Sequence, residues 1–340
     1  IIMSETNTSI GVVVVAFNSA DVIIGCVESL LAQQGRAPRI IVVENASTDD
    51  TVTVLRNWTA ANSVTLAEFP ADARPQGDAA GAVTLISAGV NRGFAGGVNL
   101  GLEVLAAMPE IDHFWILNPD AFADVGASQA ILSQAAKVPG YGLMGGRVLY
   151  ADPPGRVQID GGVVNLWTGV SGNVNLGRDA VSVAPPKGED LDFITGANMV
   201  ASRHFYDRVG PMREDYFLYY EEADWALRRG DMPLVVAPDF VVSHHAGTAI
   251  GSPTLDRLAS PFSFWFKYRS RMLFVRRFNP VGLPVAMAYA TAKAAQLMLK
   301  RAFPQALTLL RAVYGFGPPA SVRARLSPEA AKIAFGRASK

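Results

Sequence analysis

Three carboxylates stand close together in an aromatic and apolar segment, YFLYYEEADW, at residues 216–225. Apolar surroundings and neighbouring like charges both raise a carboxylate pKa, which suits a general base. Adjacent residues on a helix point about 100° apart, so Glu221 and Glu222 should differ in role, as base and positioning group. The alternative is an acid-rich helix start in which Asp224 pairs with Arg228 one turn later. We interpret that pair as structural and Glu222 as functional.

A second group of polar residues could bind a metal ion. Asn118 and Asp120 come directly after the apolar run HFWIL, with one proline between them. A carboxylate held there, facing a diphosphate, could ligate Mg²⁺ or Mn²⁺, which would neutralise a leaving nucleotide diphosphate. His244 and His245 end another apolar run and could ligate the same metal or hydrogen-bond the diphosphate. Alternatively, Asp120 caps a turn and the histidines are structural.

The segment NRGFAGGVN, residues 91–99, has three glycines within five residues. Glycines let the backbone approach a ligand closely, and N–H groups at the following helix start can meet phosphate. The spacing is not G-x-G-x-x-G, and the segment follows a late strand, which argues against a dinucleotide dehydrogenase. A tight helix-entry turn is the alternative. The candidate donor-binding residues here are Asn91, Gly93, Phe94, Gly96, Gly97 and Asn99.

The elements that position these residues follow an α/β pattern. Apolar runs at 10–17 and 39–44 predict buried parallel strands. A helix from Asp21 to about Gln34 and another starting at 49–51 complete right-handed βαβ units. Further strands are expected at 64–69 or 83–87 and at 113–117, with a helix at 99–107.

Ligands of such sheets bind beyond the carboxyl ends of the strands. The two first predicted strands end near five residues that could contact a nucleobase and ribose: Ala16, Phe17, Asn18, Glu44 and Asn45. The alternative is that the polar ones only form turns and cap helices.

The later part of the chain changes character. Residues 144–192 predict β-hairpins or an excursion over the sheet, followed by strands at 193–201 and 234–238. From residue 262 the chain is helical and basic, with a break at Pro318 and Pro319. We therefore expect an α/β fold with a mostly parallel central sheet flanked by helices, comprising a nucleotide-binding and catalytic domain at 1–260 and a helical basic extension at 261–340.

Charge and composition narrow the possible environments. Half of the residues are apolar, which fits a globular core, and the single cysteine, Cys26, excludes a disulfide framework and is expected in the core of a protein from a reducing compartment. Of 30 basic and 30 acidic residues, 14 basic and one acidic lie in 267–340. This asymmetry suggests an anionic membrane surface as partner, with a solvated helix face or a homodimer contact as alternatives. No nucleic-acid-binding module is recognised.

Two further expectations concern membranes. We expect no signal peptide, with Met3 as the natural start. The apolar segment 281–299 is interrupted by Pro284 and Lys293, so we expect it to lie on a membrane or pack on the body rather than span a bilayer.

Taken in order, these segments resemble family 2 glycosyltransferases of the GT-A fold, and most closely a bacterial rhamnosyltransferase-like subgroup. The resembling segments cover roughly residues 10–280: VVVVAFNS (12–19), VVENASTDDT (42–51), NRGFAGGVNLG (91–101), ILNPDA (116–121), residues 193–228, HHAGT (244–248) and FSFWFKYRSRMLFVRRF (262–278).

The resemblance implies a Rossmann-like GT-A domain and an inverting, metal-dependent transfer from a nucleotide-diphosphate sugar. Asn18, Glu44 and Asn45 would lie near the base and ribose, and Asp120 would ligate Mg²⁺ or Mn²⁺ with help from a histidine. Glu222 would deprotonate the acceptor hydroxyl. The acceptor would contact five residues of the 193–228 segment: Thr195, Gly196, Ala197, Asn198 and Trp225.

By the same resemblance, dTDP-rhamnose is the first choice of donor, with UDP- and GDP-sugars open. The acceptor would be a glycan or a polyprenyl-diphosphate-linked glycan in bacterial polysaccharide assembly. The expected location is cytoplasmic and peripheral, on the inner face of the plasma membrane.

The chain departs from the family's usual residues at three places. It has Glu44-Asn45 for Asp-Asn, Asn118-Pro119-Asp120 for Asp-x-Asp, and Glu221-Glu222 for Glu-Asp. The last departure leaves Glu221 open as the base. The imperfect metal motif also leaves room for a catalytically degenerate nucleotide-sugar sensor or scaffold. A nucleotidyltransferase is disfavoured, because no glycine-rich basic loop follows the first strand.

Overall fold

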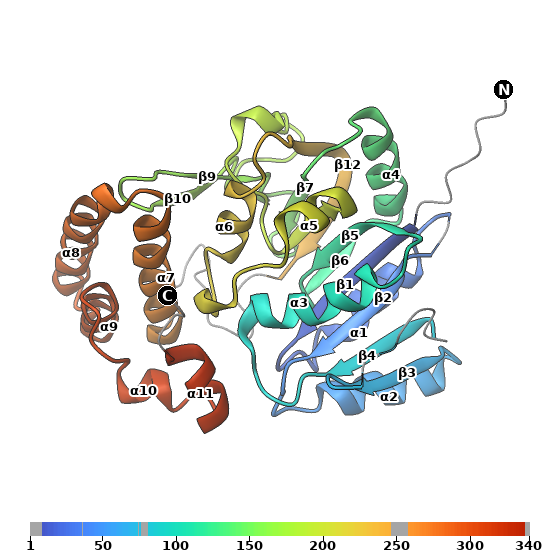
Figure 1. Ribbon diagram of the computed structural model, residues 1–340, viewed down its shortest axis with the longest axis horizontal. Coiled ribbons are helices and arrows are strands. Elements are labelled where there is room, and N and C mark those ends of the chain that lie inside the picture. The colour runs from blue at the N-terminus through green and yellow to red at the C-terminus, as the bar shows by residue number, and fades with distance from the viewer. Residues whose placement is uncertain (1–8, 36, 74, 76–80, 246–257, 337–340) are drawn as a thin grey trace.

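The computed structural model describes residues 9–35, 37–73, 75, 81–245 and 258–336 (Figure 1). Met3 and residues 246–248 of the HHAGT segment lie outside these ranges. A ten-stranded sheet has the order β3-β4-β2-β1-β5-β11-β7-β12-β6, with β8 paired to β7. Its strands are β1 Ser9–Ala16, β2 Arg39–Glu44, β3 Leu66–Pro70, β4 Val83–Ser87, β5 Ile111–Leu117, β6 Ala121–Ala123, β7 Leu143–Tyr150, β8 Val157–Ile159, β11 Asn198–Ser202 and β12 Leu234–His244.

The first five strands of the chain are paired in parallel, as is β12 with β7. β11 runs antiparallel between β5 and β7, and β6 and β8 are antiparallel to their partners. The predicted α/β fold with a mostly parallel central sheet is therefore confirmed. Both strands that the sequence left as alternatives are present, as β3 and β4. Outside the sheet, β9 Gly162–Val164 and β10 Ser171–Asn173 form a hairpin.

Helices cover both faces of the sheet (Figure 1). Alternate side chains of β1 point to opposite faces, so Val12 and Val14 pack in one core with α1 and α4, whereas Val13 and Val15 pack in the other with α3. This two-sided burial explains the unbroken apolar run of the strand. The helices are α1 Ile23–Leu31, α2 Thr51–Ala61, α3 Gly93–Ala106, α4 Ala127–Lys137, α5 Arg203–Val209, α6 Glu221–Leu227, α7 Pro261–Phe278, α8 Leu283–Leu299, α9 Phe303–Val313, α10 Ala320–Arg323 and α11 Pro328–Phe335.

Several boundaries differ from those predicted. α3 begins at Gly93 rather than at 99, because the glycine-rich segment forms the first turns of the helix itself. β7 lies inside the sheet, so the excursion predicted for 144–192 starts only after Tyr150. Asp21 does not cap α1, whose N-cap is Val22 without a side-chain hydrogen bond. Cys26 is fully buried, which confirms its place in the core.

The C-terminal helices α7 to α11 stack beside the sheet domain and share a hydrophobic core with it (Figure 1). α7 contributes aromatic residues such as Phe266 and Phe274 to that core. Among the helices in the described ranges, none is both long enough and apolar enough to cross a bilayer.

Candidate functional site

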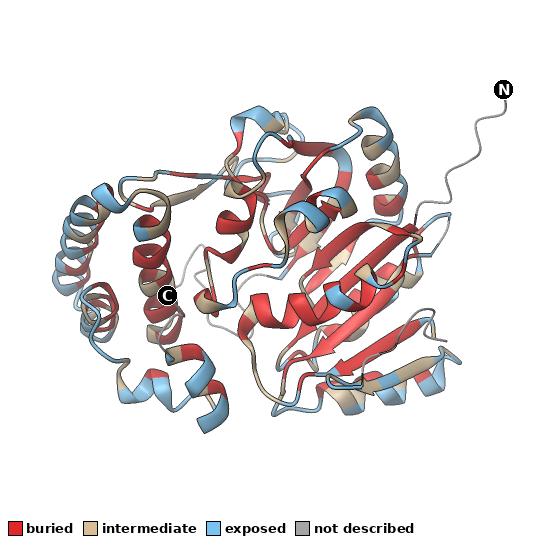
Figure 2. Ribbon diagram, in the orientation of Figure 1, coloured by how far each residue is buried: buried red, intermediate tan, exposed pale blue. Residues whose placement is uncertain are grey.

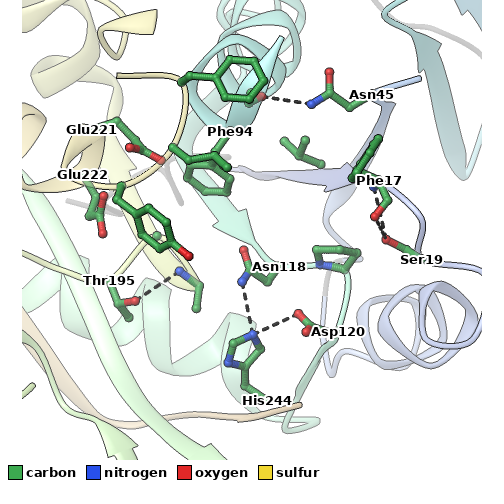
Figure 3. Close-up of a pocket in the computed structure, with 18 of the residues that line it drawn as sticks. Phe17, Ser19, Asn45, Phe94, Asn118, Asp120, Thr195, Glu221, Glu222 and His244 are labelled. Atoms are coloured by element: carbon green, nitrogen blue, oxygen red, sulfur yellow. Dashed lines mark hydrogen bonds and ion pairs between the residues drawn. The ribbon is translucent and has the colours of Figure 1, made fainter. Parts of the chain in front are cut away.

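A pocket of about 400 Å³ lies where three parallel strands end (Figure 3). Phe17 directly follows β1, Asn45 follows β2 and Asn118 follows β5, so each strand places one side chain in its wall. The segment 217–219 and the start of α6 form another part of the wall. The predicted site residues that line the pocket are Phe17, Asn45, Asn91, Gly93, Phe94, Asn118, Asp120, Thr195, Gly196, Ala197, Glu221, Glu222 and His244.

Asn45 fixes the start of α3 beside the pocket. Its Nδ2 donates to the Gly93 carbonyl over 3.0 Å, and its Oδ1 accepts from the Arg92 N–H over 2.9 Å. The Asn91 Oδ1 accepts from the Gly93 N–H over 2.9 Å. The sequence left two roles open for Asn45, ligand contact and turn formation. Its side chain forms hydrogen bonds within the turn, and it also lines the pocket.

Ala16, Asn18 and Glu44 do not line the pocket. Asn18 Oδ1 accepts from the Thr48 N–H over 2.8 Å, which ties the turn after β1 to the turn after β2. The Glu44 carboxylate is buried and accepts from the Ser47 N–H. The alternative interpretation of Asn18 and Glu44 as turn formers describes these contacts, and their contact with a nucleotide stays a prediction.

The glycines after Gly93 serve packing rather than an open ligand cradle. A Cβ on Gly97 would come within 2.6 Å of Val15 Cγ1, so this glycine lets α3 lie close on β1. Gly93 has φ of 72°, and a Cβ there would meet the Phe217 carbonyl oxygen. Gly96 faces Arg92 and Glu214, also outside the pocket. Neither Gly96 nor Gly97 lines the pocket, so their contact with the donor stays a prediction.

Asn99 is also turned away from the pocket. It is buried in α3, where its Nδ2 donates to the Met212 carbonyl and to Glu214 Oε1, both over 2.9 Å. These bonds fasten α3 to the segment that leads into residues 217–220. Asn99 therefore helps to position residues 217–220 in the pocket wall but does not line the pocket itself.

Asp120 and His244 meet because short strand β6 pairs with the end of β12, with His244 opposite Ala121. His244 Nε2 lies 2.9 Å from Asp120 Oδ1 and 3.2 Å from Asn118 Nδ2. On the other side of the ring, Nδ1 lies 2.6 Å from Gln158 Oε1. A ring whose Nδ1–H donates to Gln158 presents Nε2 to the pocket, as in histidines that bind metals.

This pair of side chains fits a divalent cation. Mg²⁺ and Mn²⁺ accept carboxylate and imidazole ligands and commonly complete their shell with phosphate oxygens and water. Within the described ranges, no group of three His, Cys, Asp or Glu side chains is arranged to hold a metal by itself. The predicted ligand His245 does not join the pair, since its exposed ring packs edge-on against Phe122 with centroids 5.2 Å apart.

Residues 217–220 form a strained strap in front of α6. Phe217, Tyr219 and Tyr220 have positive φ of 67°, 66° and 72°, a conformation that non-glycine residues rarely adopt. Contacts from α7 hold it. Ser270 Oγ donates to the Leu218 carbonyl over 2.8 Å, and Tyr219 Oη lies 2.6 Å from Ser263 Oγ. The C-terminal helix α7 thus positions the residues that lead directly into Glu221 and Glu222.

The two glutamates at the start of α6 both line the pocket but differ in exposure. Glu221 is 3% exposed, and its Oε2 has no hydrogen-bond partner within the part of the chain that the structure describes, whereas Glu222 is half-buried. Burial, with repulsion from Glu222, holds the pKa of Glu221 well above its usual range, and burial also raises the pKa of Glu222. Both carboxyls therefore hold a proton more tightly than in water, which suits proton transfer.

Asp224 has the structural role that the sequence suggested. Arg228 Nε donates to Asp224 Oδ1 over 2.7 Å, which confirms the predicted pair one helical turn apart. Tyr216 Oη and Arg277 Nη1 donate to the other oxygen over 2.9 and 3.2 Å. The fully buried carboxylate joins α6, α7 and the residues before the strap.

Glu221→Gln is expected to raise the melting temperature, and to raise it more at about pH 8 than at about pH 5. A carboxyl whose pKa rises on folding stabilises the fold below its unfolded value of about 4.5, and this contribution is lost as pH rises through the folded pKa. The Gln amide removes the buried charge and keeps an acceptor oxygen. Thermal unfolding across this pH range measures the effect. The exposed Glu189→Gln is the control, and equal shifts at both pH values would contradict the expectation.

On the side predicted for the acceptor, Thr195, Gly196 and Ala197 line the pocket. Asn198 and Trp225 do not. Asn198 is fully buried in β11 and accepts from Trp115 Nε1 over 2.8 Å. Trp225 is fully buried against Phe205. The predicted acceptor contacts of these two residues are therefore wrong, because both side chains lie in the core.

The sequence did not point to several pocket residues. Tyr150, Gln158 and Asn173 come from β7, β8 and β10, where the pattern indicated only short strands. Phe262, Arg325 and Leu326 come from the C-terminal extension. Arg325 stacks on the Phe262 ring, with its Cζ 4.7 Å from the ring centroid. For the strap at 217–220, the sequence offered one indication of a place in the site, the run of aromatic residues directly before Glu221.

Comparisons with known proteins bear on the family and the fold. Residues 11–158 match the family model described as Glycosyl transferase family 2. The chain is similar to crystal structures of GalNAc-T7 with UDP, GalNAc and Mn²⁺, at 12% identity and a TM-score of 0.56, over 91% of this chain and 55% of that one. It is also similar to S. aureus TarS 1–349, at 13% identity and a TM-score of 0.50, over 94% of this chain and 83% of that one.

TarS 1–349 is also known in complex with UDP. No curated protein sequence matches the chain. The chain spans about half of the length of GalNAc-T7, and at these identities the likeness shows the fold.

Proposed function

We propose that the protein is an inverting glycosyltransferase. The premise is the match of residues 11–158 to glycosyl transferase family 2. It moves a sugar from a nucleoside diphosphate to a hydroxyl group of a glycan or a lipid-linked glycan. One observation carries the proposal: a single pocket is lined on one side by Glu221 and Glu222 and on another by Asp120 and His244 (Figure 3). A proton acceptor for the acceptor hydroxyl and a binding group for the donor diphosphate can therefore act in one reaction.

In the proposed reaction, Glu222 takes the proton of the acceptor hydroxyl. The hydroxyl oxygen forms a bond to the anomeric carbon of the donor sugar as the bond from that carbon to the diphosphate oxygen breaks. The nucleoside diphosphate leaves with the bonding electron pair, and one displacement inverts the configuration. The half-buried position of Glu222 favours it over the buried Glu221 for contact with an acceptor. Thr195, Gly196 and Ala197 are the residues proposed to border the acceptor.

Asp120 and His244 are the residues proposed to hold Mg²⁺ or Mn²⁺, with Gln158 orienting the imidazole. The cation supplies positive charge to the departing diphosphate. Support comes from the convergence of the two side chains and from the Mn²⁺ in the GalNAc-T7 structure. Within the described ranges no three His, Cys, Asp or Glu side chains are arranged to hold a metal by themselves, so phosphate oxygens of the donor and water would complete the shell of a bound cation.

The nucleobase and ribose are proposed to lie near Phe17, Asn45 and Asn91, at the ends of β1 and β2 and the start of α3. UDP bound to TarS supports a nucleoside diphosphate, and dTDP-rhamnose remains the first choice of donor, with UDP- and GDP-sugars next. A thermal-shift screen of UDP, dTDP and GDP with and without Mn²⁺ should identify one base that raises the melting temperature. No shift with any of the three would contradict the proposal.

Consumption of the donor distinguishes an enzyme from a nucleotide-sugar sensor. An enzyme releases nucleoside diphosphate from the matching donor when an acceptor is present, and slowly by hydrolysis when it is absent. A sensor or scaffold binds the donor with the same thermal shift and leaves it intact. Release of nucleoside diphosphate, measured by chromatography, is the expected result.

Arg325→Gln is expected to weaken nucleoside diphosphate binding by about tenfold, a loss of ~1.4 kcal/mol for one charged contact. Arg325 is the only Arg or Lys among the pocket-lining residues that the structure describes, alongside three carboxylates. A permanent cation there can offset the diphosphate charge. Calorimetric titration with the diphosphate and with the uncharged nucleoside measures the effect, which should appear only for the first.

Arg323→Gln is the matched control for this prediction. Arg323 lies on the same short segment, but its guanidinium stacks on Phe335 at 5.3 Å and does not line the pocket. Equal losses in both variants would mean that Arg325 acts through the packing of the C-terminal helices and not on the diphosphate.

A further inference from the structure

Helices α8 and α9 form a hairpin at the outer edge of the molecule, far from the sheet (Figure 1). α8 spans Leu283–Leu299 and α9 spans Phe303–Val313, so three residues, 300–302, connect them. Arg301 in this turn has φ of 59°. Figure 2 shows a large exposed area along α8, on the side away from α7.

The burial of α8 is the reverse of that in an ordinary surface helix. Its buried side consists mainly of small residues, Ala286, Ala290 and Ala294, with Leu297. The large side chains point outward instead: Val281 just before the helix is 75% exposed, Val285 45%, Tyr289 46% and Leu299 86%. Val281, Val285 and Tyr289 follow one another at four-residue spacing, and Leu299 falls on the same side at about 100° per residue, so the four form one stripe. A helix that turns its larger apolar residues to the outside is expected to have a second contact there.

α9 and the connecting turn extend this surface. Phe303 and Leu307 are exposed one turn apart on α9, and Met298 is exposed at the end of α8. Tyr314 Oη lies 2.8 Å from Thr291 Oγ1, which joins the exposed sides of the two helices. We call this set of exposed residues, from 281 to 314, the hairpin face.

The charges beside the hairpin face all have one sign. Residues 258–328 contain no Asp or Glu. The cations on the hairpin are Lys293, Lys300, Arg301 and Arg311, and both Lys300 and Arg301 are exposed at the turn next to Leu299. Apolar side chains flanked by Lys and Arg are typical of segments that lie in the interface of an anionic bilayer.

Some cations of the basic extension point into the protein and not toward its surface. Arg269 donates to the Asp215 carbonyl, and Arg271 is buried with its Nε on Tyr220 Oη. Arg277 pairs with Asp215 and Asp224. These cations hold α7 on residues 215–224, which include the strap, so only some of the basic residues counted in the sequence are available to a surface partner.

We propose that the hairpin face docks on the surface of an anionic lipid bilayer, with the turn at 299–303 entering the headgroup region. A second copy of this chain fits less well, because a twofold contact would bring the same cations of both copies together without an acidic partner from this region. The proposal does not depend on sugar transfer. It predicts that the side of the pocket formed by Phe262, Arg325 and Leu326 lies near the membrane, because these residues belong to the same C-terminal extension as the hairpin.

Vesicle flotation of the full chain tests the proposal, with phosphatidylcholine vesicles that contain or lack phosphatidylglycerol. The wild-type protein is expected to float with the anionic vesicles and to bind less as salt increases. The double variant Leu299→Ser, Phe303→Ser should lower the partition coefficient on the order of tenfold or more, because two large side chains no longer enter the interface. Lys300→Gln with Arg301→Gln should weaken binding to anionic vesicles only.

Val181→Ser is the matched control, since Val181 is 97% exposed in a loop outside the hairpin. Its binding should equal that of the wild type, and circular dichroism should show that all variants are folded. Wild-type protein that stays unbound, or a double variant that floats like the wild type, would overturn the proposal. So would a wild-type dimer in sedimentation that the double variant dissociates while neither protein binds vesicles. Donor binding is measured on the same samples, so a failed membrane proposal is told apart from a failed enzyme proposal.

Discussion

Glu222→Gln is expected to slow sugar transfer by roughly 10²–10⁴-fold, the usual contribution of a general base, while donor binding stays close to that of the wild type. Glu222 lines the pocket and is reachable from it, and burial raises its pKa. The amide keeps the size of the side chain but cannot accept the proton of the acceptor hydroxyl. Initial rates and donor affinity, measured on the same preparation, separate the two effects.

The pH profile gives a second readout for this prediction. A base with a raised pKa is protonated at low pH, so kcat/KM of the wild type should fall as pH decreases through that pKa. Because the variant has no such base, its residual rate should not follow the same limb. Glu221→Gln is the matched comparison from the neighbouring position.

If Glu221→Gln were inactive while Glu222→Gln turned over almost normally, the base would be Glu221. Glu221, which also lines the pocket, would then meet the acceptor hydroxyl from its nearly buried position in the wall. Similar large losses in both variants would indicate that the coupled pair transfers the proton as a unit.

Asp120→Asn is expected to lower the transfer rate on the order of 10²–10³-fold and to remove stimulation by Mn²⁺. Asp120 is the carboxylate in contact with His244, and these two side chains are the proposed cation ligands. An amide oxygen in the same place binds a divalent cation more weakly than a carboxylate. Rates across a Mn²⁺ titration and donor affinity with and without Mn²⁺ measure the change.

The control for this variant is Asp239→Asn, an exposed carboxylate on the same strand as His244. It should leave both the rate and the Mn²⁺ dependence unchanged. An Asp120→Asn protein with the wild-type rate and the wild-type Mn²⁺ titration would rule out the metal assignment. A wild-type protein that works equally well with a chelator would do the same.

The local pattern of the sequence determined the parallel half of the fold. The apolar runs at 10–17 and 39–44 became β1 and β2 with shifts of at most one residue, because strands buried on both faces need continuous apolar side chains. The order of strands and helices then brought Phe17, Asn45 and Asn118 to one edge. That part of the pocket follows from chain order and the geometry of βαβ units.

Residue type alone did not settle other parts of the site, because the same type of residue can contact a ligand or pack inside the protein. Gly96 and Gly97 have the freedom to approach a ligand, but Gly97 lies against Val15 of β1 and Gly96 faces Arg92 and Glu214. Trp225 stands three residues after Glu222, yet its side chain lies in the core while Glu222 faces the pocket. A short helix turns neighbouring residues to different sides, and the sequence does not say which side the pocket will be on.

The candidate reactive side chains can be recognised from local sequence: a pair of glutamates, an aspartate after a buried strand and a histidine after another. Which of them meet depends on how the elements pack. Asp120 and His244 are 124 residues apart and come together through the pairing of β6 with β12, while Gln158 joins them from β8. The packing of the elements also places α7 against the strap and turns the large side chains of α8 outward. Such contacts join distant segments, so they depend on how the elements pack and not on the local pattern of any one of them.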